Sequence, residues 1–587
     1  MAFNAWYGLD RKLRLTAEDI PENANIRRDT GNDLGQTDMT FNTARYVGSL
    51  LCTILLGHGL LCVGCASGDE ASTPTDAPQV DSVENDTPAD SDVVTPDTAT
   101  TFDAGPPRNP YPEPGAWGPP TGPGAPAINF TEAELYQNCA FITGGVTDTE
   151  DHHNLVVMYD GLMLMPWAPE WGLEGGLSFF DISEPCEPKL FSEGLTEVMR
   201  ETHSIGFSHI DGAWAVTNHI DWPAFSGGIM FWDISDITAP KVVSTLLMPG
   251  FGYPDSYARV TMSVFWQAPY VYVAGADNGI YVIDANDPTT PEVVHQHVFE
   301  PVMRTGQVQA IGNLLVVTAM EGPRTVLMDI SDPAFPQPIP GGDYLARDAA
   351  GEPREAYFTN TYGQYIYYAR KEQGGGLMIY DISNPEEPTF RSDYVSDGNG
   401  GYVFVKEDIA YVGESNFAAL YDVSDLDNIT EITRLTLEGD LDTITPIGNL
   451  AILSVDADGN AGEATTVTPA LQAPDISPPQ VLWTWPEDGA KNLPLTSRFG
   501  LSCNEMVEPK SAWTGSVRLY IKDTDPALTR VEGHISVQEH IVNFVPAQPL
   551  APGTTYVLEV PAGGLTDYSM NALVDAVRIE VTTFGMP

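Results

Sequence analysis

Short apolar runs alternate with polar turns along the chain between residues 150 and 470. One pattern recurs: a run of bulky apolar residues ends in Asp, and a polar stretch that usually contains proline follows, as in GGLMIYDISNPEEP at residues 375–388. The aspartates that end these runs lie 41 to 52 residues apart: Asp181, Asp233, Asp284, Asp329, Asp381 and Asp422. Self-similarity at such a period indicates one supersecondary unit that is repeated along the chain.

Each repeat contains four apolar runs, which are rich in β-branched and aromatic residues. Such runs are typical of strands. At the end of the third run, the Asp carboxylate is expected to accept a hydrogen bond from the backbone N–H two residues later, which forms an Asx-turn. The prolines that follow lack an N–H and stop the strand. Four strands in a repeat of about 40 to 50 residues predict a blade of a β-propeller.

The run GLMIYDISNPEEP resembles the LVIVD repeat, a bacterial propeller repeat, and the resemblance extends from about residue 150 to residue 470. Six copies are clear, and residues 444–459 are a degenerate seventh in which Asp456 takes the place of the repeat aspartate. We therefore expect an all-β chain with a seven-bladed propeller over residues 129–472; six blades are the alternative. The segment CAFITGG, residues 139–145, is expected to close the ring by adding a strand to the last blade.

A second module is expected over residues 473–587, where short alternating strands recur about every 8 to 12 residues, as in a β-sandwich. Four stretches resemble a bacterial Ig-like domain of surface-layer and adhesin-type proteins: PEDGAKNLPLTS, residues 504–507, residues 550–556 and residues 564–572. The resemblance implies a spacer or a weak binder, and it carries over no catalytic residues.

The N-terminal region contains an apolar run, residues 46–65, that is preceded by Arg45 and ends in LCVGC. Residues 39–64 are interpreted as a signal peptide, with translation starting at Met39 and residues 1–38 as a mis-assigned upstream start. The end of the run resembles the lipobox of bacterial lipoproteins, which implies cleavage before Cys65, lipidation of Cys65, and a place at the outer membrane or cell surface. The alternative is an uncleaved membrane span.

Residues 65–128 are expected to form a disordered, acidic tether rich in Pro and Thr, because they contain too few apolar groups to bury. The whole chain carries 81 Asp and Glu against 27 Lys and Arg, a formal charge of -54. Such a charge repels nucleic acid. The expected partners are the membrane, through the lipid anchor, and surface proteins or polysaccharide.

Basic and imidazole side chains recur where the first strand of each repeat is expected to begin, near one mouth of the central channel. We expect them either to bind an anion or a metal together, or to form separate ion pairs with neighbouring acids such as Glu201 or Glu355. They are His152, His153, Arg200, His203, Arg259, Arg304 and Arg354.

Three further features carry chemistry. Asp456, Asp458 and Asn460 have alternating oxygen ligands like half of a calcium loop, so calcium is the one cofactor that the sequence suggests, with a plain turn as the alternative. Cys139 and Cys186 are candidates for a disulfide, and Cys503 is expected to remain a buried thiol. Aromatic loops are expected to place Trp167, Trp171 and Trp222 on one rim, where they either stack on sugars or peptides or only cover the blade edges.

Two functions are compatible with these features. The first is a surface-tethered binding or scaffolding protein, which the absence of a recognisable nucleophile–base pair or complete ligand set favours. The second is a secreted propeller enzyme, with or without a metal, that works at the channel mouth through His152, His153 and His203. Propellers host both kinds of function, so the fold does not decide between them.

Overall fold

The computed structural model describes residues 118–142, 151–152, 155–169, 175–199, 202–209, 212–221, 226–251, 261–371, 374–455 and 465–585. The leader, Cys65 and the predicted tether up to residue 117 lie outside the described residues. The prediction of a disordered tether is wrong for residues 118–128, because Gly122 and Gly124 donate backbone hydrogen bonds to the Asp160 and Gly161 carbonyls and Ala125 donates to the Tyr568 carbonyl. Within the described ranges, no helix has both the length and the apolar character needed to cross a bilayer.

The repeats fold into antiparallel sheets, with consecutive strands paired in order. The first sheet contains β2 (Asp151–His152), β3 (Val157–Tyr159), β4 (Leu162–Pro169), β5 (Gly175–Asp181) and β6 (Lys189–Thr196). The second contains β7 (Ile205–Ser208), β8 (Trp214–Asp221), β9 (Ser226–Asp233) and β10 (Lys241–Leu247). The third contains β11 (Ser263–Gln267), β12 (Tyr270–Ala274), β13 (Ile280–Asp284) and β14 (Glu292–His297).

The remaining repeats follow the same order. The fourth sheet contains β15 (Thr305–Ile311), β16 (Leu314–Ala319), β17 (Arg324–Asp329) and β18 (Gln337–Leu345). The fifth contains β19 (Ala356–Tyr362), β20 (Tyr365–Arg370), β21 (Leu377–Asp381) and β22 (Thr389–Tyr394). The sixth contains β23 (Val403–Lys406), β24 (Ile409–Gly413), β25 (Ala418–Asp422) and β26 (Thr430–Leu435).

The last propeller sheet is completed by the other end of the module. It contains β27 (Thr443–Ile447), β28 (Leu450–Ser454) and β29 (Thr465–Pro469), and β1 (Ala140–Ile142) pairs with β29 in the register Ala140↔Val467. The sequence-based prediction that residues 139–145 close the ring is confirmed. The adjacent Cys139 forms a disulfide with Cys186, with Cα atoms 5.0 Å apart, and this disulfide links β1 to the first sheet.

The sheets form a β-propeller, because first strands contact one another from β7 through β11, β15, β19 and β23 to β27, and β27 contacts β3. The first and second sheets, which complete the ring, meet at β6 and β10. Seven sheets are found among the described residues of this module. This count agrees with seven blades, the number that the sequence favours over six, and the blade number stays a prediction.

The repeat aspartates form the predicted Asx-turns. In each of the six clear repeats, one carboxylate oxygen accepts a hydrogen bond from the backbone N–H two residues later, at 2.8 to 3.0 Å. In the repeats of Asp181, Asp329 and Asp422, the Ser hydroxyl at that position also donates to the same oxygen. The third strand therefore ends at the Asp because the carboxylate turns the backbone out of the ladder.

The tail module is a sandwich of two sheets around its own apolar core. One sheet contains β30 (Val481–Trp485), β31 (Phe499–Cys503), β34 (Gly533–Gln538) and β35 (Ile541–Pro546). The other contains β32 (Arg518–Ile521), β33 (Arg530–Val531), β36 (Thr555–Val560) and β37 (Val577–Thr582), and two short helical turns, η2 (Pro509–Ser511) and α2 (Pro526–Thr529), connect strands. Cys503 is a buried free thiol, as predicted.

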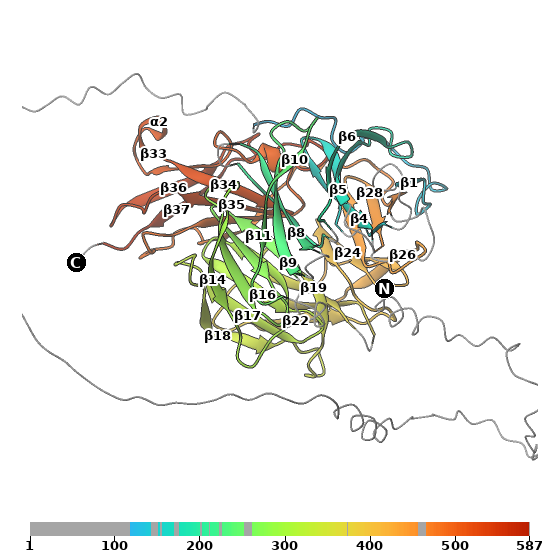
Figure 1. Ribbon diagram of the computed structural model, residues 1–587, viewed down its shortest axis with the longest axis horizontal. Helices are drawn as coiled ribbons and strands as arrows, with labels where there is room; N and C mark the ends of the chain where they lie inside the picture. Colours follow the sequence, from blue (N-terminus) through green and yellow to red (C-terminus); the bar gives the residue numbers. More distant parts are fainter. Residues whose placement is uncertain are drawn as a thin grey trace, which may run out of the picture. The chain divides into compact units, whose positions relative to one another are not determined.

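One strand of the tail joins the propeller directly. β34 pairs with β7 in the register Ser536↔Ser208 and Val537↔Phe207, so one sheet continues from the propeller into the sandwich. Figure 1 shows β34 and β35, in red, beside the green strand β11, which β34 contacts. The two modules are therefore continuous and form a single packed unit.

Candidate functional site

The tail module lies against one face of the propeller. This face is formed by the turns between the first and second strands of the sheets, which we call the first turns. At the first sheet, the Glu508 carboxylate accepts hydrogen bonds from the N–H groups of Asp160 and Gly161, at 2.7 and 3.1 Å. The Lys510 ammonium lies 2.6 Å from an Asp160 carboxylate oxygen, and both side chains are buried.

The same docking continues around the ring. Asn543 accepts hydrogen bonds from the Gln267 side chain and the Gly312 N–H, and it donates to the Ala310 carbonyl, at 2.9 to 3.0 Å. In the fifth sheet, the Gly363 N–H donates to the Ser502 hydroxyl at 2.8 Å. The docked face therefore carries specific polar contacts to sheets far apart in the sequence.

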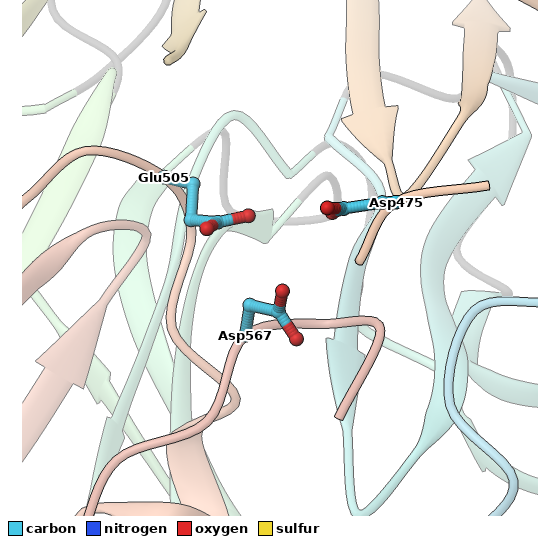
Figure 2. Close-up of side chains that lie close together, drawn as sticks. All are labelled: Asp475, Glu505 and Asp567. Carbon is cyan, nitrogen blue, oxygen red and sulfur yellow. The ribbon is translucent and has the colours of Figure 1, made fainter. Parts of the chain in front are cut away.

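Three carboxylates meet at this joint. Asp475 lies in the connection between β29 and β30, Glu505 lies two residues after β31, and Asp567 lies in the loop between β36 and β37. One oxygen from each lies within 4.8 Å of the others, and Figure 2 shows the three carboxylates facing one another. We call these three residues the acidic cluster. Because they come from three separate segments, only the tertiary structure brings them together.

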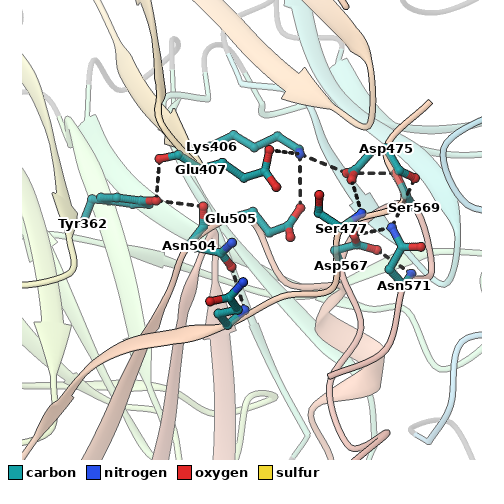
Figure 3. Close-up of polar contacts among 11 residues, drawn as sticks. Tyr362, Lys406, Glu407, Asp475, Ser477, Asn504, Glu505, Asp567, Ser569 and Asn571 are labelled. Carbon is teal, nitrogen blue, oxygen red and sulfur yellow. Dashed lines mark hydrogen bonds and ion pairs between the residues drawn. The ribbon is translucent and has the colours of Figure 1, made fainter. Parts of the chain in front are cut away.

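One cation from the propeller partly neutralises the acidic cluster. Lys406, the last residue of β23, places its ammonium 2.9 Å from Asp475 Oδ2 and 3.3 Å from Glu505 Oε2 (Figure 3). The Lys406 side chain is 6% exposed, and the Asp475 and Glu505 side chains are 4% and 2% exposed. Removing three carboxylates from water against a single ammonium is costly, so the cluster is short of positive charge.

The pKa values reflect this shortage. Burial raises the pKa of Glu505 to about 9, against the opposing effect of Lys406. Burial likewise raises the pKa of Asp567 to about 7, although hydrogen bonds from Asn571 oppose the rise. For Lys406, burial lowers the pKa, but the charges of Glu505 and Asp475 outweigh burial and raise it overall. The acidic cluster therefore favours an additional bound positive charge, either a proton or a metal ion.

Glu505 also retains an unused ligand atom. Its Oε1 is buried and has no hydrogen-bond partner among the described residues. Asp567, in contrast, accepts from the Asn571 N–H at 2.7 Å and from the Asn571 side chain at 2.9 Å. The Ser477 N–H donates to Asp475 Oδ1 at 3.0 Å. These bonds fix the direction of two carboxylates and leave Glu505 Oε1 as an unsatisfied acceptor.

The sequence predicted a different site, at the starts of the first strands. Arg304 lies 3.2 Å from Asp277 and 3.3 Å from Glu321, and these acids belong to neighbouring sheets. Arg354 lies 2.6 Å from Asp348. At these two positions the structure contains the ion pairs of the alternative interpretation, although with other acids than Glu201 and Glu355.

The predicted imidazoles are only partly described. His203 is 5% exposed. Its backbone N–H donates to the Asn218 side-chain oxygen at 2.9 Å, and its imidazole ring packs near Phe358. His152 ends β2, but its side chain, together with His153, Arg200 and Arg259, lies outside the described residues, as do Asp456, Asp458 and Asn460.

The predicted aromatic rim is wrong at its one described member. Trp167 lies within β4, is 5% exposed, and donates from its indole N–H to the Ser178 hydroxyl at 2.9 Å. The strand continues through the stretch that was interpreted as a loop, so the ring points into the sheet packing. Trp171 and Trp222 lie outside the described residues.

The sequence alone did not identify the acidic cluster, although Glu505 and Asp567 lie in two stretches that resemble the Ig-like family. Residues 504–507 and 564–572 were used only as marks of the Ig-like module. A signal was present in these stretches: an acid beside Asn504, and an Asp four residues before Asn571. The contribution of Lys406, about 100 residues earlier in the chain, has no local signature.

Comparisons with known proteins agree with this architecture. Residues 475–584 match the bacterial Ig-like domain family, and residues 258–297 and 359–396 match the LVIVD repeat. No curated protein matches the chain.

Several solved structures are similar at low identity. A putative 6-phosphogluconolactonase from Bacteroides fragilis is 10% identical, with a TM-score of 0.38 over 48% of this chain and 83% of that one. A periplasmic gluconolactonase from Pseudomonas aeruginosa is 10% identical, with a TM-score of 0.38 over 52% and 85%. A hypothetical selenium-binding protein from Sulfolobus tokodaii is 7% identical, with a TM-score of 0.39 over 55% and 93%. Similarity at this level says nothing of the chemistry of this chain.

The two matched families occupy the two modules described above. Residues 258–297 and 359–396 contain the third and fifth propeller sheets, and residues 475–584 contain the strands of the sandwich. The chain is therefore a β-propeller that contains LVIVD repeats and carries a C-terminal bacterial Ig-like domain.

Proposed function

We propose that the protein is a lipid-anchored module of the bacterial outer membrane or cell surface that binds or scaffolds other envelope components. The lipobox-like sequence at Cys65 supports the anchor, and the acidic segment of residues 65–117 supports a tether that holds the folded unit away from the membrane. The docked tail module supports a rigid binding unit, because β34 continues the sheet of β7.

One observation carries the binding role. The outer strand β6 has three large apolar side chains that are about half exposed, with Leu190 at 51%, Phe191 at 49% and Leu195 at 62%. Apolar side chains that gather on one exposed strand mark sites of protein–protein contact. An edge strand can also pair its backbone with a partner. We therefore propose that β6 is the contact surface for a surface protein.

The anchor is tested by fatty-acid labelling of the full chain in a Gram-negative host. We expect the wild type to be labelled and to fractionate with membranes, and Cys65→Ser to lose the label. Labelling that does not depend on Cys65 would rule out this anchor.

The contact surface is tested by binding to isolated cell envelopes. Phe191→Lys combined with Leu195→Lys is expected to weaken binding about tenfold or more, because it places charge on the apolar strand. Leu528→Lys, at a side chain that is 70% exposed on α2, is the matched control and should bind as the wild type does. Equal binding by the double variant and this control would contradict the proposal.

A further inference from the structure

We propose that the acidic cluster of Asp475, Glu505 and Asp567 binds one hard divalent cation at the joint between the propeller and the Ig-like domain. The three carboxylates offer one oxygen each within 4.8 Å of one another. Carboxylate oxygens are the ligands that calcium and magnesium take from proteins. This site is separate from residues 456–460, where the sequence suggested calcium.

The charge balance supports a divalent ion. Three buried carboxylates face one ammonium, that of Lys406, which leaves two negative charges when all three are ionised. Glu407 adds a fourth carboxylate 3.8 Å from the same ammonium, but its side chain is 37% exposed and can be solvated. One divalent cation would neutralise the buried charge, whereas Lys406 alone does not.

The unsatisfied atom of Glu505 is an independent observation that points to a ligand. Glu505 is 1% exposed, and its Oε1 has no hydrogen-bond partner among the described residues. Lys406 contacts the other oxygen, Oε2, so the ammonium does not use Oε1. Figure 2 shows the Glu505 carboxylate directed toward Asp475 and Asp567. A buried acceptor without a partner is costly, and a bound cation removes that cost.

The surroundings also hold the other two carboxylates in place for a metal. Asn571 donates to both oxygens of Asp567, and the Ser477 N–H donates to Asp475 Oδ1. Each of these oxygens keeps a second lone pair, so the hydrogen bonds orient the carboxylates without blocking them. Such outer hydrogen bonds are typical of metal-ligating carboxylates.

A cation at this position would join three segments of the tail module. Asp475 belongs to the connection that leaves the propeller, and Glu505 and Asp567 belong to the Ig-like domain. Lys406 already fixes Asp475 and Glu505 to the sixth propeller sheet. Binding is therefore expected to stabilise the folded tail module, because the ion would hold three of its segments together and would not bind the unfolded chain.

The experiment uses the full chain after treatment with EDTA, in about 0.15 M KCl to screen the acidic surface. Calcium and, separately, magnesium are titrated calorimetrically, and thermal unfolding is followed with each ion. We expect one saturable site for at least one of the two ions and a rise of several degrees in the unfolding midpoint.

Glu505→Gln and Asp567→Asn test the ligands. Each is expected to weaken ion binding roughly tenfold or more and to remove the thermal shift. Glu505→Gln resembles the protonated, metal-free side chain, so this variant should fold as the EDTA-treated wild type does. Asp427→Asn is the control for general attraction to surface acids, since the Asp427 side chain is 77% exposed, and it should bind as the wild type does.

Three results would overturn the proposal. One is the lack of a saturable site for either ion in the wild type. The second is unchanged affinity in both Glu505→Gln and Asp567→Asn. The third is an equal loss of affinity in Asp427→Asn, which would indicate binding to the acidic surface in general.

Discussion

Single carboxylates have opposite roles in the two modules, and burial separates these roles. The repeat aspartates lie at the ends of third strands near solvent and accept hydrogen bonds from the local backbone, as Asp381 does from the Ser383 N–H at 2.8 Å. The acids of the joint are buried, and they lack enough local donors or cations. Glu505 is the extreme case, with one unsatisfied oxygen. Carboxylates therefore end strands in the propeller, whereas the burial of carboxylates at the joint costs electrostatic free energy.

Asp381→Ala tests the strand-ending role. The change removes the acceptor for the Ser383 N–H and for the Gln364 side chain, which donates at 3.2 Å. We expect the free energy of unfolding to fall by roughly 1 kcal/mol, measured by urea denaturation. Asp381→Asn keeps an oxygen acceptor and should lose less. If the Ala and Asn variants are equally stable, the Asx-turn does not carry the effect.

The pH dependence of stability tests the buried acid. With EDTA present, folded Glu505 keeps its proton up to its raised pKa of about 9, whereas the unfolded side chain loses it near pH 4.3. The folded state therefore binds more protons, and its stability falls as pH rises. From this group we expect a loss of up to about 1.4 kcal/mol per pH unit between pH 7 and 9. The charged groups facing Glu505 are Lys406, Asp475, Asp567 and Glu407.

The comparison that isolates this effect uses two Gln variants. Glu505→Gln should flatten the fall in the free energy of unfolding between pH 7 and 9, relative to wild type. Glu539→Gln is the control, because burial raises the pKa of Glu539 only to about 7, so its contribution ends at lower pH. Identical slopes for wild type and Glu505→Gln above pH 7 would show that Glu505 is ionised in the folded protein.

At the scale of elements, the β34–β35 hairpin joins the modules in two ways. β34 adds its backbone to β7, and Asn543 of β35 satisfies groups of the third and fourth propeller sheets. Close backbone approach adds a steric requirement at Gly312, whose φ is +54°. A Cβ there would lie 2.0 Å from the Trp485 carbonyl oxygen, so no other residue fits this turn beside the tail.

Asn543→Ala tests this element. It leaves the Gly312 N–H and the Ala310 carbonyl without partners in a buried joint, at a cost of roughly 1–3 kcal/mol for each group. We expect a lower unfolding midpoint in calorimetry. Asn416→Ala, at an exposed loop position, is the control and should unfold as the wild type does. If both variants have the same midpoint, the hairpin contacts contribute little to docking.

At the scale of the whole molecule, the propeller and the Ig-like domain share buried charge pairs as well as strands. Lys510 pairs with Asp160, and Lys406 pairs with Asp475, in both cases with buried side chains. Breaking one partner of a buried pair leaves an uncompensated charge, which is strongly destabilising. The two modules are therefore expected to unfold together.

A chain that ends before residue 475 tests this coupling. We expect the full chain to unfold in a single calorimetric transition and the shortened chain to unfold at a lower temperature, because its first turns lose their partners. Limited proteolysis should also cut the shortened chain sooner at the first turns. Two separate transitions in the full chain, with the first unchanged by the truncation, would show that the modules are independent.

The propeller could be predicted from the sequence because its determinants are local. Asp381 and the residues around it specify a strand, a turn and the end of the strand within about a dozen positions, and the same pattern recurs along the chain. Ring closure by residues 139–145 was expected because the last blade of a propeller often takes a strand from the other end of the module. Trp167 was misplaced because an apolar stretch with prolines reads equally well as a loop or as a strand edge.

The acidic cluster could not be predicted in this way, since its members have no common local pattern. Asp475, Glu505 and Asp567 are separated by 30 and 62 positions, and Lys406 belongs to another module. Alternation and turn residues determine which segments become strands, because those preferences act over a few neighbouring residues. Only the tertiary structure decides which loop ends face each other across a joint, since that depends on the packing of both modules at once. The repeat and its strands were thus determined by the sequence alone, whereas the docked face and its buried charges were decided by the fold.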